Sequence, residues 1–312
     1  MSERVITRRR FLHSSATLAG SLLLSAAVLQ AAPAKRIPTA VDQVKLGKTG
    51  LKLSRLGIGT GSIGGSIQRA LGQEGFTKLI RHGYDQGITY IDTAEGYRTH
   101  GMVREAIKGL PREKLFIQTK MPGNVKNPLE AIDRYRKELG VDYIDSLLTH
   151  CAVTKNWDEE RKRVLDAFEE AKQKGIIRAH GVSCHALPAL TKAAGMKWCD
   201  VHLVRINPQG AHMDTPAEKW NAKSNESHVP GVMEQIGIMK KNKHGIIGMK
   251  LIGNGDFKKF ADRKRSIEFA MQCGLLDAVV IGFKTTAEID EAIKLMNAAL
   301  KETTQVAFRS SI

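Results

Sequence analysis

The sequence predicts an α/β fold, a (β/α)8 TIM barrel with an N-terminal β-hairpin. The main observation is that short apolar runs, typical of buried strands, alternate with amphipathic stretches of helical spacing. The eight runs begin near Arg55, Thr89, Leu115, Ile144, Ile177, Val201, Ile246 and Ala278. Such alternation produces a parallel sheet, and eight strand–helix units close into a barrel. The chain of 312 residues is long enough, since a barrel of this kind takes about 250.

A hairpin, several helices and one long connection complete the predicted barrel. Apolar and polar residues alternate in Val44–Leu53 around a turn at 47–50, which predicts a hairpin that covers the bottom of the barrel. Apolar residues recur at helical spacing in 76–84, 102–110, 164–171 and 289–296. The longest connection follows the sixth strand, where residues 207–229 are polar and rich in turn residues. Connections of that length are usually functional or mobile, so we expect a lid over the barrel mouth.

A glycine pattern after the first strand is compatible with a different fold. Gly59, Gly61 and Gly64 fit G-x-G-x-x-G, which is how a doubly wound, dinucleotide-binding sheet would begin. However, no helical face begins at Gly64, and the carboxylate at Asp92 comes later than the roughly 20 residues typical of that motif. The eight repeated units therefore favour the barrel.

Residues 1–34 have the pattern of an export signal, which leaves 35–312 as the barrel domain. The arginine run Arg8–Arg10 precedes an uncharged, small-apolar run over 16–29, and Ala32–Ala34 supplies small residues for cleavage. The apolar run is shorter than the roughly 20 residues of a membrane span. The arginines resemble the twin-arginine (Tat) signal of bacteria. We therefore expect the Tat machinery to export the chain to the periplasm, with no stable membrane span in the mature protein. An uncleaved inner-membrane anchor is the alternative.

The composition narrows the classes of partner. The net charge of +16 suits an anionic partner, but basic residues are scattered and aromatic residues make up only 5%, so we expect no nucleic-acid binding. A positive field toward an anionic cofactor or substrate is the better explanation. The four cysteines show no disulfide framework in their spacing, and we expect them to be mainly free and buried. They are Cys151, Cys184, Cys199 and Cys273.

Four titratable side chains lie at or just after the ends of three consecutive strands. Asp92 ends the second strand, Tyr97 follows it in the loop, and Lys120 and His150 end the next two. The ends of parallel barrel strands meet at one mouth, so these groups should converge. A lysine ammonium lowers the pKa of a nearby phenol, and a carboxylate compensates the burial of the lysine. The set predicts carbonyl reduction or alcohol oxidation, with His150 orienting the oxygen and a cofactor supplying hydride.

These residues resemble the catalytic tetrad of the aldo-keto reductase family. The resemblance rests on Asp92-Thr-Ala-Glu-Gly-Tyr97, on Lys120 in Gln-Thr-Lys-Met and on His150 in Leu-Leu-Thr-His, and it extends from Leu46 to the eighth unit. It implies that Tyr97 is the general acid and base, that Lys120 and Asp92 tune it, and that His150 orients the substrate. It also implies a small-molecule carbonyl or alcohol substrate and a nicotinamide cofactor extended across the mouth.

The resemblance also assigns residues to the cofactor. The matching positions are Thr60, Asp92, Ser183 and Cys184 at the nicotinamide end, Lys250, Leu251, Gly253 and Gly255 in the loop over the pyrophosphate, and Gly282, Lys284 and Thr285 near the adenosine 2′-phosphate. Glycines allow close backbone approach to phosphate, and a helix N-terminus after the eighth strand favours an anion. NADP(H) is therefore the favoured cofactor, NAD(H) is the alternative, and no metal is assigned.

Several positions depart from the family pattern. Asp290 stands where an arginine is common, which weakens the preference for NADP(H) over NAD(H). At the nicotinamide end, Cys184, Leu203 and Met249 replace the usual asparagine, glutamine and stacking aromatic residue. Gly61 stands where many relatives carry a tryptophan that walls the substrate pocket, which predicts a wider pocket.

The leading expectation is an exported NAD(P)(H)-dependent oxidoreductase that interconverts an alcohol and an aldehyde, ketone or sugar carbonyl. The altered nicotinamide end would also suit a non-catalytic dinucleotide-binding protein or sensor on the same barrel. Two pairs at the ends of adjacent strands, His150-Cys151 and Cys184-His185, raise a third hypothesis, a zinc site in a metal hydrolase, or alternatively a Cys151–Cys184 disulfide. Neighbouring side chains on a strand point in opposite directions, which argues against the zinc site.

Overall fold

The computed structural model describes residues 36–309, and residues 37–309 lie in one compact unit. The strands in this part of the chain are β1 (Gln43–Lys45), β2 (Lys52–Ser54), β3 (Leu56–Gly59), β4 (Tyr90–Asp92), β5 (Phe116–Met121), β6 (Ile144–Ala152), β7 (Ile177–Cys184), β8 (Val201–Arg205), β9 (Gly245–Met249) and β10 (Ala278–Gly282). Strands β3 to β10 form a closed barrel in chain order, in which β10 pairs with β3 and every pairing is parallel. The (β/α)8 prediction is confirmed, and each barrel strand begins within one residue of its expected start.

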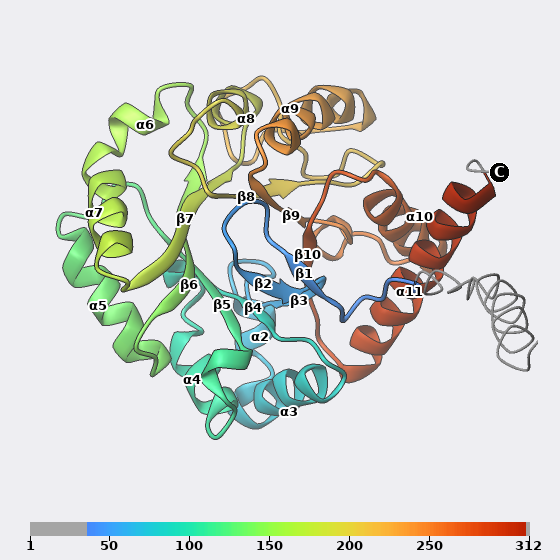
Figure 1. Cartoon of the computed structure of the whole chain (residues 1–312), viewed down its shortest axis with the longest axis horizontal. Helices are drawn as coiled ribbons and strands as arrows, with labels where there is room; N and C mark the ends of the chain where they lie inside the picture. Colours follow the sequence, from blue (N-terminus) through green and yellow to red (C-terminus); the bar gives the residue numbers. More distant parts are fainter. Residues whose placement is uncertain (1–35, 310–312) are drawn as a thin grey trace, which may run out of the picture. The chain divides into compact units, whose positions relative to one another are not determined.

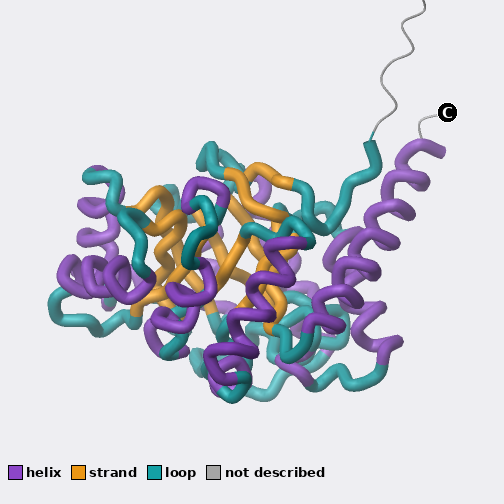
Figure 2. Tube along the Cα trace, turned by 90° about the horizontal axis from the view of Figure 1, so that it is seen from below, coloured by secondary structure: helices purple, strands orange, loops and turns teal. Residues whose placement is uncertain are grey.

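Helices surround the barrel and cover the outer face of its strands (Figures 1 and 2). The α-helices described are α2 (Ser66–Arg69), α3 (Gly72–Asp85), α4 (His100–Ile107), α5 (Pro128–Leu139), α6 (Trp157–Glu160), α7 (Lys162–Gln173), α8 (Leu187–Ala194), α9 (Val229–Lys241), α10 (Phe260–Gln272) and α11 (Thr286–Arg309). Four 3-10 turns are also described: η1 (Glu95–Tyr97), η2 (Arg112–Lys114), η3 (Glu226–His228) and η4 (Gly253–Gly255). Apolar helix faces such as Phe76, Leu79 and Ile80 on α3 are buried against the sheet. Burial of these faces is the main favourable contribution to the fold.

A second, smaller core fills the inside of the barrel. Inward-facing Tyr90, Phe116 and Leu148 pack there with Leu46 and Leu53 of the β1–β2 hairpin. The Lys48 amide donates to the Lys243 carbonyl at 2.9 Å, and the Gly47 amide donates to Asp277 at 3.0 Å, just before β9 and β10 begin. The predicted hairpin is therefore present, and it closes the barrel at the N-terminal ends of the strands. The opposite end is left for a site.

The long connection after β8 lies at that opposite end. Within residues 206–225 it contains neither helix nor strand. Its backbone and side chains bond to the segments that follow other strands: Thr215 accepts from the Leu187 amide, and Glu218 accepts from the Lys155 amide at 2.7 Å. Arg205 at the end of β8 donates to the Trp220 carbonyl at 2.9 Å. The predicted mouth loop is thus fastened at several points to the other mouth loops.

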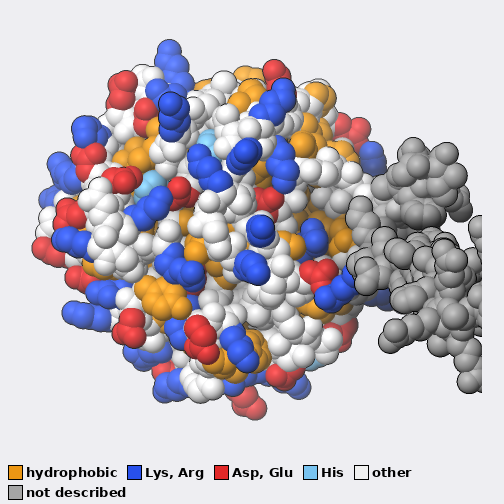
Figure 3. Space-filling model, in the orientation of Figure 1, with side chains coloured by type: hydrophobic (Ala, Val, Ile, Leu, Met, Phe, Trp, Pro, Cys, Tyr) orange, Lys and Arg blue, Asp and Glu red, His pale blue; other side chains and the backbone are white. Residues whose placement is uncertain are grey.

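Among residues 36–309, no helix is long and apolar enough to cross a membrane. The predicted Tat signal, 1–34, lies outside the described residues. Figure 3 shows Lys and Arg side chains dispersed among Asp and Glu over the face in view, in keeping with the scattered basic residues of the sequence.

Candidate active site

A fully buried ion pair forms the base of the site. The Lys120 ammonium, which is 0% exposed, donates to both carboxylate oxygens of Asp92 at 2.7 Å and to the carbonyl of Thr93 at 2.8 Å. Burial is the largest single influence and lowers the pKa of Lys120, but Asp92 and Tyr97 together outweigh it, so the net pKa is raised. The ammonium therefore stays charged at neutral pH. Adjacent strands β4 and β5 place the pair, as the sequence predicted.

Gln118, which the sequence did not single out, supports this ion pair from below through hydrogen bonds. Gln118 points into the barrel two residues before Lys120, and its amide nitrogen donates to Asp92 Oδ1 at 2.9 Å and to the Tyr90 hydroxyl at 2.8 Å. Its carbonyl oxygen accepts from Ser146 on β6 at 2.9 Å. These bonds fix the orientation of Asp92, and through it that of Lys120. The only signal in the sequence was the two-residue period that places Gln118 on the same strand face as Lys120.

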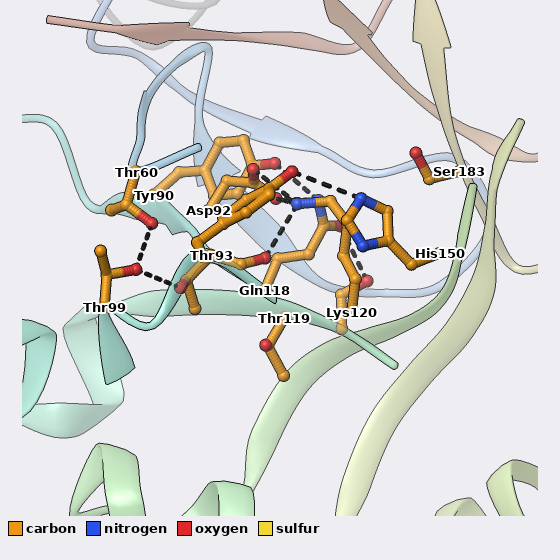
Figure 4. Close-up of polar contacts among 12 residues, drawn as sticks. Thr60, Tyr90, Asp92, Thr93, Thr99, Gln118, Thr119, Lys120, His150 and Ser183 are labelled. Atoms are coloured by element: carbon orange, nitrogen blue, oxygen red, sulfur yellow. Dashed lines mark hydrogen bonds and ion pairs between the residues drawn. The ribbon is translucent and has the colours of Figure 1, made fainter. Parts of the chain in front are cut away.

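Tyr97 and His150 meet above the ion pair (Figure 4 shows His150, Asp92 and Lys120). The Tyr97 hydroxyl lies 3.4 Å from His150 Nε2, and the two rings pack edge to face with centroids 5.5 Å apart. The Lys120 ammonium lies 4.9 Å from the centroid of the Tyr97 ring. The structure therefore brings all four predicted catalytic side chains together at the carboxyl ends of β4, β5 and β6.

Burial and the charge of Lys120 act in opposite directions on the pKa of Tyr97. Burial raises the pKa, the positive charge of Lys120 lowers it, and the net result is a pKa above the ordinary value. Lys120 lowers the phenol pKa, as expected, but desolvation is the larger contribution and sets the net direction. Tyr97 is consequently a protonated phenol at neutral pH, the form that can donate a proton.

A bulge at the end of β6 aims His150 into the mouth. The pairing of β6 with β7 is irregular between Thr149 and Ala152, and Cys151 has a φ of 58°, a left-handed conformation uncommon for a side-chain-bearing residue. Arg161 bridges the bulge: its guanidinium donates to the carbonyls of His150 at 2.7 Å and Cys151 at 2.9 Å. Burial, followed by the charges of Lys120 and Arg161, lowers the pKa of His150 to about 3, so this imidazole is neutral.

The η1 turn that carries Tyr97 is anchored at both ends. The Glu95 carboxylate accepts from the Tyr135 hydroxyl at 2.8 Å and pairs with Arg134, both on α5. At the other end, Arg69 of α2 donates to the Tyr97 carbonyl and, at 3.1 Å, to the Gly64 carbonyl. The sequence did not indicate these anchors, because they join segments far apart in the chain.

Two adjoining cavities open beside the tetrad. The smaller, of about 70 Å³, is lined by Asp92, Tyr97 and the start of the loop after β9. The larger, of about 470 Å³, lies between that loop and the start of α11. Both are lined by Ser62, Ile252, Asn254, Ile281 and Gly282. A dinucleotide laid along this path would have its nicotinamide beside Tyr97 and its adenosine at α11, so the cavities fit an extended nicotinamide cofactor.

Of the residues assigned to the phosphate end, all except Gly253 and Thr285 line these cavities. Lys250 and Leu251 line the smaller cavity, Gly255 and Lys284 the larger, and Gly282 both. Gly253 packs against Phe257 instead, since a Cβ there would lie 2.8 Å from that ring.

Two threonines assigned to the cofactor have hydroxyl partners within the protein. The buried Thr60 hydroxyl lies 2.8 Å from that of Thr99. The Thr285 hydroxyl accepts from the Glu288 amide at the start of α11. The structure therefore does not place these two hydroxyls in the cavities.

The residues at the end of β7 differ from the nicotinamide-binding arrangement that the resemblance implies. Cys184 is 1% exposed and packs in the outer core between barrel and helices, so its side chain points away from the mouth. Ser183 lies inside, and its hydroxyl is 3.3 Å from Nε2 of His185, a residue that sequence reasoning treated only as a rim position. The assignment of Cys184 to the cofactor is therefore not supported by its position. Leu203, which stands where the family usually carries a glutamine, is buried in the barrel interior.

The rim cluster proposed from the sequence does not assemble as a metal site. Among residues 36–309, no group of three or more His, Cys, Asp and Glu side chains is placed to hold a metal ion. Cys151 and Cys184 are free thiols, so the alternative disulfide is absent. Cys184 and Cys199 are buried, whereas Cys151 and Cys273 are half-buried.

Charges at the adenosine end are mixed. Lys284 is exposed beside the larger cavity, but its amide donates to the Glu288 carboxylate at 2.6 Å. Arg263, on the same wall, is paired with Glu291 at 2.6 Å. Asp290 turns to His82 of α3 at 2.7 Å and does not line the cavity. The carboxylate that replaces the family arginine is therefore directed at a neighbouring helix.

The sequence is similar to curated proteins that are named as reductases. The aldo-keto reductase YhdN of Bacillus subtilis is 32% identical over 158 residues, which is 46% of this chain and 47% of that protein. The NADH-specific methylglyoxal reductase of Escherichia coli is 29% identical over 169 residues, 46% of this chain and 52% of that protein. The chain thus spans about half the length of the curated relatives it matches.

Solved structures show the same fold. The aldo-keto reductase AKR11C1 from Bacillus halodurans, at 16% sequence identity, superposes with a TM-score of 0.64 over 84% of this chain and 96% of its own. The family model of the aldo/keto reductases matches residues 55–309, which include the barrel and the whole tetrad. This chain is therefore a member of the aldo/keto reductase family.

Proposed function

We propose that this protein is an exported, NAD(P)(H)-dependent oxidoreductase that interconverts a small-molecule carbonyl and the corresponding alcohol, with Tyr97 as general acid and base. The observation that carries the proposal is the convergence of the Tyr97 hydroxyl, His150 Nε2 and the Lys120–Asp92 pair beside adjoining cavities. Family membership and relatives named as reductases support the same reaction class.

In this mechanism the cofactor, when bound, supplies hydride to the carbonyl carbon or accepts it from the alcohol. The carbonyl oxygen takes a hydrogen bond from Tyr97, which transfers its proton as the carbon–oxygen double bond becomes single. The Tyr97 oxygen then carries the negative charge, and the buried Lys120 ammonium stabilises it. Asp92 keeps that ammonium in place. Alcohol oxidation reverses these steps.

His150 acts as a neutral hydrogen-bonding group. Its pKa of about 3 excludes an imidazolium at neutral pH, so it orients the reacting oxygen and does not supply the proton. The 3.4 Å separation from the Tyr97 hydroxyl is long for a strong hydrogen bond and leaves both groups available to one substrate oxygen.

The decisive test is a panel of aldehydes, ketones, sugars and polyols with NADPH and NADH, run with the wild type and Tyr97→Phe. We expect turnover that Tyr97→Phe reduces by about 10²- to 10⁴-fold while the cofactor Kd stays unchanged. If the wild type binds dinucleotide but turns over none of the panel, the non-catalytic sensor becomes the better explanation.

We propose NADP(H) as the preferred cofactor, with Lys284 beside the 2′-phosphate. Lys284→Ala should then weaken NADPH binding by roughly tenfold and leave NADH binding nearly unchanged, since one charge-assisted contact is lost. Equal Kd values for NADPH and NADH in the wild type would contradict this preference.

We propose that the chain leaves the cytoplasm folded, with cofactor bound, through the Tat machinery. The support is the arginine run and short apolar segment of residues 1–34. Mature protein isolated from the periplasm should release a dinucleotide when it is denatured. Replacement of Arg8–Arg10 by lysines should retain the chain in the cytoplasm; export unchanged by this variant would exclude the Tat route.

A further inference from the structure

Lys250, the first residue after β9, carries an ammonium group that has no acidic partner. Its Nζ donates to the Asn254 side chain at 2.9 Å, and it forms no ion pair within the described part of the chain. An ammonium has three donor hydrogens, so two of them remain for a ligand. Lys250 lines the smaller cavity together with Asp92 and Tyr97, so this charge stands beside the proposed reaction centre.

The backbone at the start of this loop is held in an uncommon conformation. Lys250 has a φ of 67° and Asn254 a φ of 54°, in the left-handed region that favours glycine. The Lys250 carbonyl accepts from the Gly253 amide at 2.9 Å and from the Asn207 side chain at 3.2 Å. Residues held in this region of φ cluster where a protein fixes a ligand. The fold therefore determines where Lys250 stands.

Arg205, at the end of β8, is a second cation on the inner side of the mouth. Its position pairs with Met249 in the parallel β8–β9 register, directly before Lys250. Leu203, two residues earlier, lies in the barrel interior, so strand alternation directs Arg205 inward as well. Arg205 is 4% exposed, and its Nε has no hydrogen-bond partner among the described residues. Asp214 lies 3.5 Å from that nitrogen without hydrogen-bonding to it, so the guanidinium keeps donor capacity for a ligand.

The positive charges at the mouth act on one another and on the reacting groups. Burial, followed by the charges of Arg205 and Lys120, lowers the pKa of Lys250 to about 8. Lys250 in turn contributes to the low pKa of His150. Asp92 compensates Lys120 through two hydrogen bonds, but no carboxylate does the same for Lys250. An anion bound between Lys250 and Arg205 would relieve this repulsion.

Two kinds of anion can reach this charge, the pyrophosphate of the cofactor and an acidic group of the substrate. Lys250 lines the smaller cavity and is absent from the lining of the larger one, where the adenosine half of a dinucleotide would lie. Its charge acts on His150 and Cys151, which lie together at the β6 bulge. The ammonium is therefore close to the reacting groups, which favours an acidic group of the substrate.

We infer that the substrate carries a carboxylate in addition to its carbonyl or alcohol group, and that Lys250, supported by Arg205, binds this carboxylate. The inference rests on the proposed function and names its class of substrate. A carboxylate accepts several hydrogen bonds at once, which suits an ammonium with spare hydrogens beside a guanidinium. The smaller cavity, of about 70 Å³, favours a short oxo acid or aldehyde acid. A neutral carbonyl compound would leave the two cations without a counter-charge.

The experiment measures kcat/KM for pairs of carbonyl compounds that differ only in a carboxylate or a carboxamide. The pairs are glyoxylate and glyoxylamide, succinic semialdehyde and its amide, and para-formylbenzoate and para-formylbenzamide, in which the acidic group lies progressively farther from the carbonyl. We expect the wild type to prefer at least one acid over its amide by about tenfold, since only the acid forms charge-assisted hydrogen bonds. Lys250→Met, which keeps the length of the side chain and removes the charge, should abolish that preference by raising KM for the acid.

Two further variants control for charge and for position. Lys250→Arg retains a positive charge and should retain part of the preference for the acid. Lys241→Met on α9 should keep the full preference, because Lys241 is exposed and makes no ion pair among the described residues. The Kd of NADPH is measured for every variant, so that an effect on cofactor binding is seen separately from one on the substrate.

The outcomes distinguish the inference from the proposed function. If the wild type reduces acids and amides equally well, or if Lys250→Met keeps the wild-type preference, the inference is overturned while the proposed function stands. If Lys250→Met weakens NADPH binding and slows acid and amide alike, the ammonium serves the cofactor pyrophosphate, and the inference is overturned as well. If the wild type reduces no compound of either panel with NADPH or NADH, the proposed function falls with it.

Discussion

The Tyr97 ring packs so closely against Gly61 that no residue with a side chain fits at position 61. A Cβ on Gly61 would lie 2.3 Å from Cε2 of the Tyr97 ring, 2.4 Å from Cζ and 2.9 Å from the hydroxyl oxygen. The glycine therefore does more than widen a pocket: the phenol occupies the space that a side chain at position 61 would need. The expected wider pocket is partly filled by the residue proposed to do the chemistry.

Gly61→Ala should consequently displace the Tyr97 hydroxyl from His150. A misplacement of about 1 Å can cost on the order of 10²-fold in rate, so we expect kcat to fall by one to two orders of magnitude while cofactor Kd changes little. Gly101→Ala on α4 is the control, because open space surrounds that position. Wild-type kcat in Gly61→Ala would show that the Tyr97 ring has room to adjust.

The anchor on the Tyr97 turn gives a second prediction. Glu95→Ala removes the carboxylate that accepts from the Tyr135 hydroxyl at 2.8 Å and pairs with Arg134. We expect a loss of about 1 kcal/mol in the free energy of unfolding and a lower kcat, since η1 is freed at one end. Tyr135→Phe should reproduce part of both effects. Glu234→Ala, an exposed acid on α9 with no ion pair or side-chain hydrogen bond among the described residues, should change neither denaturation midpoint nor turnover.

The pH dependence of turnover should reflect a neutral histidine and a protonated phenol. With a His150 pKa of about 3 and a Tyr97 pKa raised by burial, neither group changes protonation between about pH 5 and pH 8. The rate of carbonyl reduction should be flat across that range because Tyr97 stays almost fully protonated, whereas alcohol oxidation, which needs the phenolate as base, should accelerate with rising pH because the small phenolate fraction grows. An acid limb near pH 6.5 in the reduction profile would instead indicate an imidazolium at position 150.

A buried histidine pair near the N-terminal ends of β8 and β9 predicts acid sensitivity of the fold. His202 Nε2 and His244 Nδ1 lie 2.8 Å apart, and burial together with the neighbouring His244 lowers the pKa of His202 to about 3. The unfolded chain takes up this proton near pH 6.5, whereas the folded chain takes it up only near pH 3. Stability from this site is therefore complete above about pH 6.5 and is lost as the pH falls toward 3.

The measurement is urea unfolding at several pH values with the wild type and His202→Gln. The free energy of unfolding of the wild type should fall by a few kcal/mol between about pH 7 and pH 4. His202→Gln keeps a hydrogen-bonding group but takes up no proton, so its decline should be shallower. Equal slopes for the two proteins would assign the acid sensitivity to other groups.

The sequence by itself determined the barrel and the four side chains of the tetrad. Hydrophobic periodicity is local, so the eight units, the hairpin and the strand ends could be located from neighbouring residues alone. Parallel strands place their carboxyl ends at one mouth, and this is why Asp92, Lys120 and His150 could be expected to meet.

Only the tertiary structure decided how these groups are held and protonated. The η1 anchors, the bridge of Arg161 across the β6 bulge and the Gly61–Tyr97 contact join residues far apart in sequence, and no local pattern encodes them. The direction of the Tyr97 pKa depends on burial, which competes with the charge of Lys120 and is a property of the whole packed site. Likewise, the one-residue change of face along β7 sends Cys184 into the core and leaves His185 at the mouth.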